Sequence, residues 1–140
     1  AATVVTRDPV FGWFAYGGVL TEGEKGLEIL PRDGLRRRFA AVIPKRDIRR
    51  LKVELGRDGF AANQPIVMDF ALGRISFMVE NRTADAHKTE VRLSFPVRTG
   101  YELRQNGKLV LLTATGEEDY PWRAELDVAG KDVKVELVRI

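Results

Sequence analysis

Period-two alternation of apolar and polar residues is the feature of this sequence that most limits its fold. In residues 90–95 the apolar side chains are Val91, Leu93 and Phe95, with polar residues between them. Successive side chains of a strand point to opposite faces, so this spacing predicts a strand with one apolar and one polar face. The same pattern in residues 122–128 and 133–137 predicts an antiparallel hairpin with its turn at 129–131.

Turn residues divide most of the remaining chain into further short strands. Asn106 and Gly107 tolerate the two positive φ angles of a type I′ turn, which predicts a hairpin between residues 101–105 and 108–112. Other ranges with strand composition are 11–20, 26–30, 35–43, 64–72 and 74–80, the last two forming a pair around Gly73. The apolar runs within these last two ranges, 66–68 and 77–79, favour strands that are covered on both faces.

Residues 45–55 fit two patterns. Ile48, Leu51 and Leu55 would share one face of a helix, whereas Leu51, Val53 and Leu55 would share one face of a strand. We favour the strand, because residues 56–59 have the composition of a hairpin turn.

About ten short strands joined in this way must bury one face of each sheet against a second sheet. We therefore predict a single all-β domain over residues 1–140, an antiparallel β-sandwich of the jelly-roll or Ig-like type. A chain of 140 residues without cysteine can bury roughly two-thirds of its unfolded surface, which is enough for a core without disulfides.

There is no run of about 18 apolar residues, so we expect no membrane-spanning helix. The first residues lack a methionine or a leader-like stretch and are typical of a mature or excised segment.

The sequence contains no convincing catalytic signature, and we predict that the domain is not an enzyme. His87, the only histidine, stands in a polar stretch and is expected to be a solvent-exposed loop residue. No serine lies in a Gly-x-Ser-x-Gly elbow, and the glycines do not fit phosphate-binding spacings. No loop has the ligand spacing of a calcium site either, so we predict no cofactor; a structural calcium ion would be compatible with such a sandwich but is not readable from the sequence.

Basic residues are concentrated in one stretch. Residues 32–52 contain nine Lys or Arg, among them Arg36, Arg37, Arg38, Lys45 and Arg46, against the two acids Asp33 and Asp47. Such a stretch is compatible with binding of phosphates, anionic polysaccharide or an acidic protein surface. Nucleic-acid binding would also need aromatic residues between the charges, and only Phe39 is present there. We therefore consider nucleic acid an unlikely partner and a solvated strand edge the simpler interpretation.

Two aromatic clusters give the clearest indication of a binding function. Residues 11–16 hold four rings, and alternation predicts that Phe11 and Trp13 face one way while Phe14 and Tyr16 face the other. A second cluster contains Tyr120 and Trp122, beside the acids at 117–119. Exposed flat rings could contact the apolar face of a sugar, with the acids accepting hydrogen bonds from hydroxyl groups. Ordinary core packing is the alternative for each ring. The candidate carbohydrate-binding residues are Trp13, Tyr16, Tyr120 and Trp122.

The segment from Val79 to Thr83, followed by an alternating strand and then by residues 101–103 and 106–108, resembles the accessory β-sandwich domains of large bacterial carbohydrate-active enzymes. The resemblance covers about the last 60 residues. It implies a secreted, extracellular, non-catalytic carbohydrate-binding module that attaches a linked glycoside hydrolase or similar enzyme to a polysaccharide. The alternative is a structural domain that packs on a catalytic domain without binding sugar. Residues 81–83 also match the N-glycosylation pattern, which matters only in a host that glycosylates secreted proteins.

Overall fold

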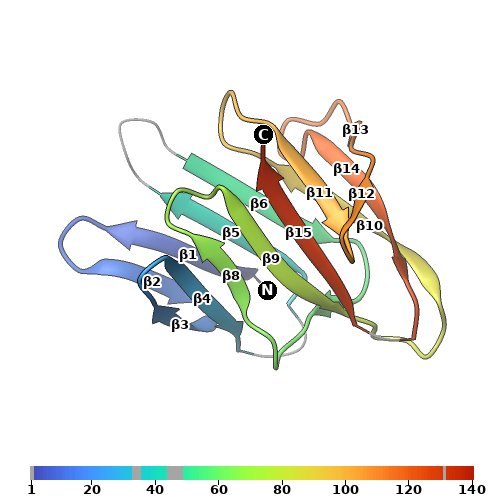
Figure 1. The fold of residues 1–140 in the computed structure, drawn as a ribbon, viewed down its shortest axis with the longest axis horizontal. Helices are drawn as coiled ribbons and strands as arrows, with labels where there is room; N and C mark the ends of the chain where they lie inside the picture. The colour runs from blue at the N-terminus through green and yellow to red at the C-terminus, as the bar shows by residue number, and fades with distance from the viewer. Residues whose placement is uncertain (1, 33–35, 44–48, 131) are drawn as a thin grey trace.

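The computed structural model describes residues 2–32, 36–43, 49–130 and 132–140, with only the backbone of Arg49. These residues form fifteen strands and no helix, and the strands make two sheets that pack face to face (Figure 1). The prediction of an all-β fold in two mostly antiparallel layers is confirmed. The jelly-roll or Ig-like type stays a prediction.

Sheet A contains the first two strands of the chain. Its order is β13 (Thr113–Ala114), β14 (Trp122–Val128), β10 (His87–Ser94), β6 (Arg49–Leu55), β5 (Arg38–Ile43), β1 (Ala2–Asp8) and β2 (Gly12–Tyr16). Strands β1 and β5 pair in parallel, and the other neighbours in this sheet are antiparallel. Strand β2 therefore forms one edge of sheet A.

Sheet B is antiparallel, and its edge strand β3 lies on the same side of the molecule as the edge strand β2 of sheet A (Figure 1). Its order is β12 (Lys108–Val110), β11 (Tyr101–Gln105), β15 (Val133–Arg139), β9 (Arg74–Glu80), β8 (Ile66–Asp69), β4 (Gly26–Pro31) and β3 (Gly18–Glu22), and the short β7 (Gly59–Phe60) also pairs with β9. The edge strands β2 and β3 are joined only by Gly17. This residue has φ +70°, and an added Cβ would lie 2.7 Å from the carbonyl oxygen of Ala2, so the corner between the sheets requires glycine.

The core lies between the sheets and is formed by every second residue of the longer strands. Three fully buried rings occupy its centre: Phe39 and Phe77 each meet Phe60 edge-on, with centroids 6.4 and 5.1 Å apart. Each such side chain stabilises the fold by roughly 1.5–3 kcal/mol relative to leaving it exposed. The outer faces are left to polar residues and to the exposed aromatic side chains described below.

The predicted hairpin between residues 122–128 and 133–137 is wrong. The first segment is β14 in sheet A, and the second is β15 in sheet B, where it pairs with β9 and β11. The same error affects residues 56–59, which lead from β6 in sheet A to β7 in sheet B. Alternation requires only that apolar side chains face the core, and the core is reached equally well from either sheet.

Other expectations are confirmed or corrected locally. Asn106 and Gly107 have φ angles of 49° and 84° between β11 and β12, as the predicted turn requires. Residues 49–55 form a strand, whereas 45–48, like residue 35, lie outside the described residues. Residues 11–20 are divided into β2 and β3, and such divisions contribute to a total of fifteen strands rather than ten. The expectation that 66–68 is covered on both faces is wrong, because Val67 points to solvent and is 39% exposed.

Candidate functional site

Strand β2 presents two aromatic side chains on the outer face of sheet A. Phe14 and Tyr16 are 39% and 64% exposed, while Trp13 and Ala15 on the opposite face pack against the core. This division confirms the predicted alternation. As an edge strand, β2 has only β1 as a neighbour in the sheet, so nothing in sheet A covers the far side of these rings.

Phe11 does not share a face with Trp13 as predicted, because it precedes β2 and belongs to a turn. The carboxylate of Asp8 accepts hydrogen bonds from the backbone N–H groups of Val10 and Phe11, over 2.7 and 2.9 Å, and these bonds hold the pKa of Asp8 below its usual value. The Phe11 ring turns toward Phe14, with centroids 6.4 Å apart. The tip of the β1–β2 hairpin is thus fixed and carries exposed apolar side chains.

The strand register places each exposed ring at the start of a row that crosses the outer face of sheet A. Every row passes over one residue of β1 and one of β5 and ends at a cation on β6. The two rows are Tyr16, Val4, Ala40, Lys52 and Phe14, Thr6, Val42, Arg50. We call these eight residues the outer platform. Since neighbouring strands lie about 4.8 Å apart, the rings and the cations are separated by about 14 Å, with short side chains between them.

Tyr120 lies beside the cationic side of the outer platform. The Lys52 ammonium nitrogen is 4.7 Å from the centre of its ring, a cation–π contact. Burial and the nearby carboxylate of Glu54 raise the pKa of Tyr120, partly opposed by Arg38, so its hydroxyl keeps its proton. Arg38 and Glu54 themselves form an ion pair over 2.8 Å. Of the four candidate residues, Tyr16 and Tyr120 are thus associated with one face of sheet A.

The two tryptophans lie elsewhere. Trp13 is partly buried, and its ring lies 5.9 Å from that of Phe70. Trp122 stands opposite the inward-facing Leu93 on β10, near one end of the sandwich, where it is 38% exposed. Of the acids expected to accept sugar hydroxyls beside it, Glu117 is already paired with Arg92 over 3.1 Å.

A cavity of about 550 Å³ opens on the outer face of sheet B. Its polar lining includes Thr21, Lys25, Glu28, Arg74 and Ser76, over an apolar floor that includes Val67. The size is that of a small-molecule site. No aromatic residue lines it, and its charges are of both signs.

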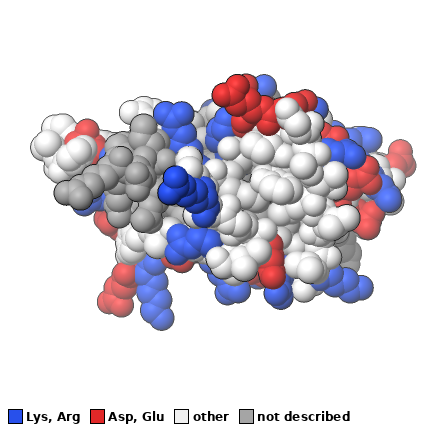
Figure 2. Space-filling view, turned by 90° about the horizontal axis from the view of Figure 1, so that it is seen from above, with Lys and Arg blue, Asp and Glu red and all other residues white. Residues whose placement is uncertain are grey.

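One end of the sandwich is largely uncharged. Figure 2 looks onto this end and shows a broad area without Lys, Arg, Asp or Glu, bordered by charges of both signs. The most exposed apolar residues after residue 70 are Val97, Leu111 and Ile140, each about four-fifths exposed. Ile140 lies next to the 95–100 loop, because its N–H donates to the carbonyl oxygen of Gly100.

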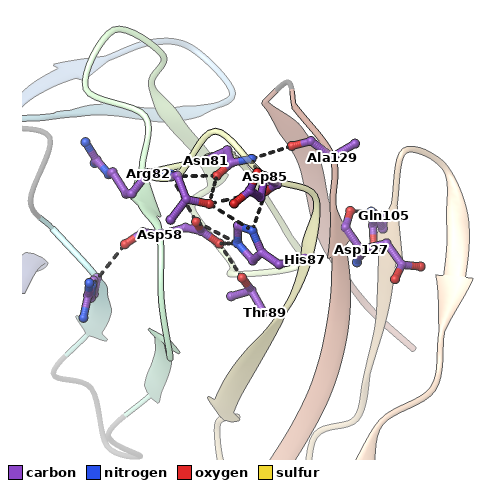
Figure 3. Close-up of polar contacts among 11 residues, drawn as sticks. Asp58, Asn81, Arg82, Asp85, His87, Thr89, Gln105, Asp127 and Ala129 are labelled. Atoms are coloured by element: carbon purple, nitrogen blue, oxygen red, sulfur yellow. Dashed lines mark hydrogen bonds and ion pairs between the residues drawn. The ribbon is translucent and has the colours of Figure 1, made fainter.

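His87 is not the exposed loop residue that the sequence suggested. It begins β10, its side chain is 9% exposed, and its Nε2 lies 2.7 Å from the fully buried carboxylate of Asp58 (Figure 3). Its Nδ1 lies 2.8 Å from the carbonyl oxygen of Asp85. Each ring nitrogen of His87 thus lies within hydrogen-bonding distance of an oxygen atom of the protein. The imidazole of His87 is therefore held within the fold by contacts on both of its nitrogens.

Asp58 connects the β6–β7 turn to the β9–β10 connection. Burial raises the pKa of its carboxyl group, but hydrogen bonds from Thr89, His87 and the backbone N–H of Arg82 outweigh burial and leave the pKa lowered. The residue has φ +68°, a conformation that aspartate tolerates better than most residues. Asp58 and its three donors therefore form a buried clamp between two loops (Figure 3), which the sequence could not reveal because the donors are 24 to 31 residues from Asp58.

The Asn81 side chain of the N-glycosylation pattern has a structural role. Its amide nitrogen donates hydrogen bonds to the carbonyl oxygens of Asp85 and Ala129, over 3.1 and 2.7 Å, and its oxygen accepts from Thr83. Figure 3 shows this amide linking the β9–β10 connection to the turn after β14. Both amide hydrogens are engaged, so a sugar attached to this nitrogen would replace one of them and remove its hydrogen bond.

Comparison with protein-family models, curated proteins and solved structures finds no match for this chain. Among the described residues there is no helix that could span a membrane. The same part of the chain contains no group of three or more His, Asp or Glu side chains placed to hold a metal ion.

Proposed function

We propose that this domain is a non-catalytic carbohydrate-binding module that holds a polysaccharide on the outer platform of sheet A. The observation that carries the proposal is the pair of rows that begin at Phe14 and Tyr16 and end at Arg50 and Lys52. They combine exposed ring faces with hydrogen-bond donors on one surface.

The chemistry of this surface fits a sugar chain. The flat face of Tyr16 is apolar and can cover the C–H face of a pyranose, while Lys52 and Arg50 can donate to hydroxyl or ring oxygens. The residues between them, Val4, Thr6, Ala40 and Val42, have short side chains and leave room for the ligand. A separation of about 14 Å between rings and cations suits several linked sugars better than one.

The polar groups of the domain support a binding role rather than catalysis. Both nitrogens of His87 face acceptors, and Glu54 near the platform is paired with Arg38. A module of this kind raises the local concentration of a linked glycoside hydrolase on its substrate. Secretion and linkage to such an enzyme belong to the same proposal.

Native gels containing soluble glucans, xylans, mannans and uronic-acid polysaccharides test the proposal by retardation of the domain. Tyr16→Ala should weaken binding about fivefold, corresponding to about 1 kcal/mol of lost ring contact, whereas Tyr16→Phe should keep most of it. Thermal unfolding verifies that each variant is folded.

Phe14 and Trp122 provide a matched comparison, because their exposed fractions are 39% and 38%. Phe14→Ala should weaken retardation and Trp122→Ala should not, since only Phe14 belongs to the outer platform. Glu28→Gln, a substitution in the cavity of sheet B, should also leave the retardation of the domain unchanged. Absence of retardation on every polysaccharide, or equal retardation of Tyr16→Ala and wild type, would contradict the proposal.

The uncharged end of the sandwich favours a second candidate function, packing against a neighbouring catalytic domain. Val97, Leu111 and Ile140 are highly exposed, Ile140 lies beside the 95–100 loop that carries Val97, and exposed apolar surface is typical of protein interfaces. An apolar fluorescent dye should bind this end, and the double exchange of Val97 and Leu111 for serine should reduce its fluorescence without affecting glycan binding. Unchanged dye binding would count against an interface here.

A further inference from the structure

The two cations of the outer platform differ from most others on sheet A in having no acidic partner within the part of the chain that the structure describes. Among the described residues, no carboxylate lies within ion-pair distance of Arg50 or Lys52. In contrast, Arg92 contacts Glu90 over 2.8 Å and Glu117 over 3.1 Å. The charges of this sheet are thus largely neutralised by one another except at the platform.

The geometry of the platform separates apolar from cationic contacts. Arg50 and Lys52 are two residues apart on β6, so they point to the same face about 7 Å from each other. Phe14 and Tyr16 have the same spacing on β2. The platform therefore has an aromatic strip and a cationic strip, both parallel to the strands, on either side of short side chains.

We infer that the polysaccharide bound by the outer platform carries carboxylate groups, as in chains of uronic acids. This inference rests on the proposed function and adds the class of glycan to it. A chain of linked uronic acids offers the C–H face of one unit to the aromatic strip and the carboxylate of another unit to the cationic strip, about 14 Å away. Lysine and arginine bind carboxylates through charge-assisted hydrogen bonds, which are stronger than bonds to neutral hydroxyls.

Tyr120 positions Lys52, one of the two residues of the cationic strip. Its ring lies under the ammonium group of Lys52, a contact that restricts the lysine without neutralising it. The raised pKa of the Tyr120 hydroxyl keeps a negative charge from forming beside a bound carboxylate. The cation is therefore both positioned and available.

A uronic-acid chain fits this surface better than a nucleic acid does. Single-stranded nucleic acids are bound along grooves in which many cations track the backbone and aromatic rings stack on the bases. The outer platform has only two cations that lack an acidic partner among the described residues, and its two rings lie about 14 Å from them rather than between them.

The test compares ligands that differ only in charge. Polygalacturonate and alginate are compared with their methyl-esterified or carboxyl-reduced forms by affinity electrophoresis and calorimetry, using the intact domain. We expect the charged forms to bind, the neutral forms to bind at least tenfold more weakly, and the affinity to fall as salt increases. Lys52→Gln and Arg50→Gln should each weaken binding of the charged form about fivefold. Lys108→Gln on β12 of sheet B is the matched control and should have no effect.

The outcomes separate the inference from the proposed function. Equal binding of charged and neutral forms with Tyr16→Ala still impaired would overturn the inference and leave the proposed function standing. Binding of no glycan would overturn both. A single-stranded oligonucleotide that binds more tightly than polygalacturonate, through the same two cations, would identify a nucleic-acid site and also overturn the inference.

Discussion

The clamp between Asp58 and His87 gives the sharpest prediction about stability. Asp58→Asn keeps the shape of the side chain, and asparagine also tolerates the positive φ of this position. The substitution removes the negative charge and replaces one accepting oxygen by an N–H₂ group. It therefore tests the ion pair with little added backbone strain.

The structure indicates the size of the effect. The Asp58 carboxylate is fully buried and accepts hydrogen bonds from Thr89, His87 and the backbone N–H of Arg82. Removing one partner of a buried ion pair costs about 3–5 kcal/mol. We expect about 3 kcal/mol for Asp58→Asn, the lower end of this range, because asparagine keeps one accepting oxygen and Thr89 can reorient its hydroxyl.

Urea unfolding at pH 7 measures this loss as a shift of the midpoint. Asp127→Asn is the control, because Asp127 is exposed and engages Gln105 through its backbone only. A loss below about 1 kcal/mol for Asp58→Asn would refute the reasoning, since it would mean that the buried charge contributes no more than a surface ion pair.

The same clamp predicts a pH dependence. The pKa of Asp58 is lowered in the folded protein, so the folded state binds protons less readily than the unfolded state. The stability from this group is fully present above the unfolded pKa of about 4 and is lost as the pH falls through the lower, folded pKa. The difference in unfolding free energy between wild type and Asp58→Asn should be larger at pH 5 than at pH 3. A difference that grows on acidification would contradict the lowered pKa.

Two further substitutions test the packing of sheet B. Gly26→Ala would place a Cβ 2.1 Å from the carbonyl oxygen of Met68 and should cost about 2 kcal/mol by thermal unfolding, whereas Gly130→Ala, with open space around it, should change stability by less than about 0.5 kcal/mol. Tyr101→Phe removes a buried hydroxyl that donates to the carbonyl oxygen of Leu72 over 2.5 Å and should cost about 1–3 kcal/mol. Unchanged thermal unfolding of Gly26→Ala would show that the backbone adapts at that site. Unchanged stability of Tyr101→Phe would show that the carbonyl oxygen of Leu72 finds another donor.

The sequence predicted the layers of this fold better than their connections. Alternation identified most of the strands and their buried faces, because the burial of every second side chain is a local property. It failed at residues 122–137, where β14 and β15 face the same core from opposite sheets. It also missed β1, whose parallel pairing with β5 joins Ala2 to Arg38 across 36 residues. Local pattern contains no information on which of two sheets a strand joins.

The candidate site has the same limit, and this explains why the platform could be recognised only in part. The outward direction of Tyr16 follows from alternation within β2, and a cationic stretch around Lys52 follows from composition. Their common surface depends on three successive registers, two of which involve β1. A shift of one residue in the parallel pairing of β1 with β5 would exchange the two faces of β1 and bury Val4 in place of Val5. Because Val5 is fully buried and Val4 is not, packing of the core fixes that register and thereby aligns the rings with the cations.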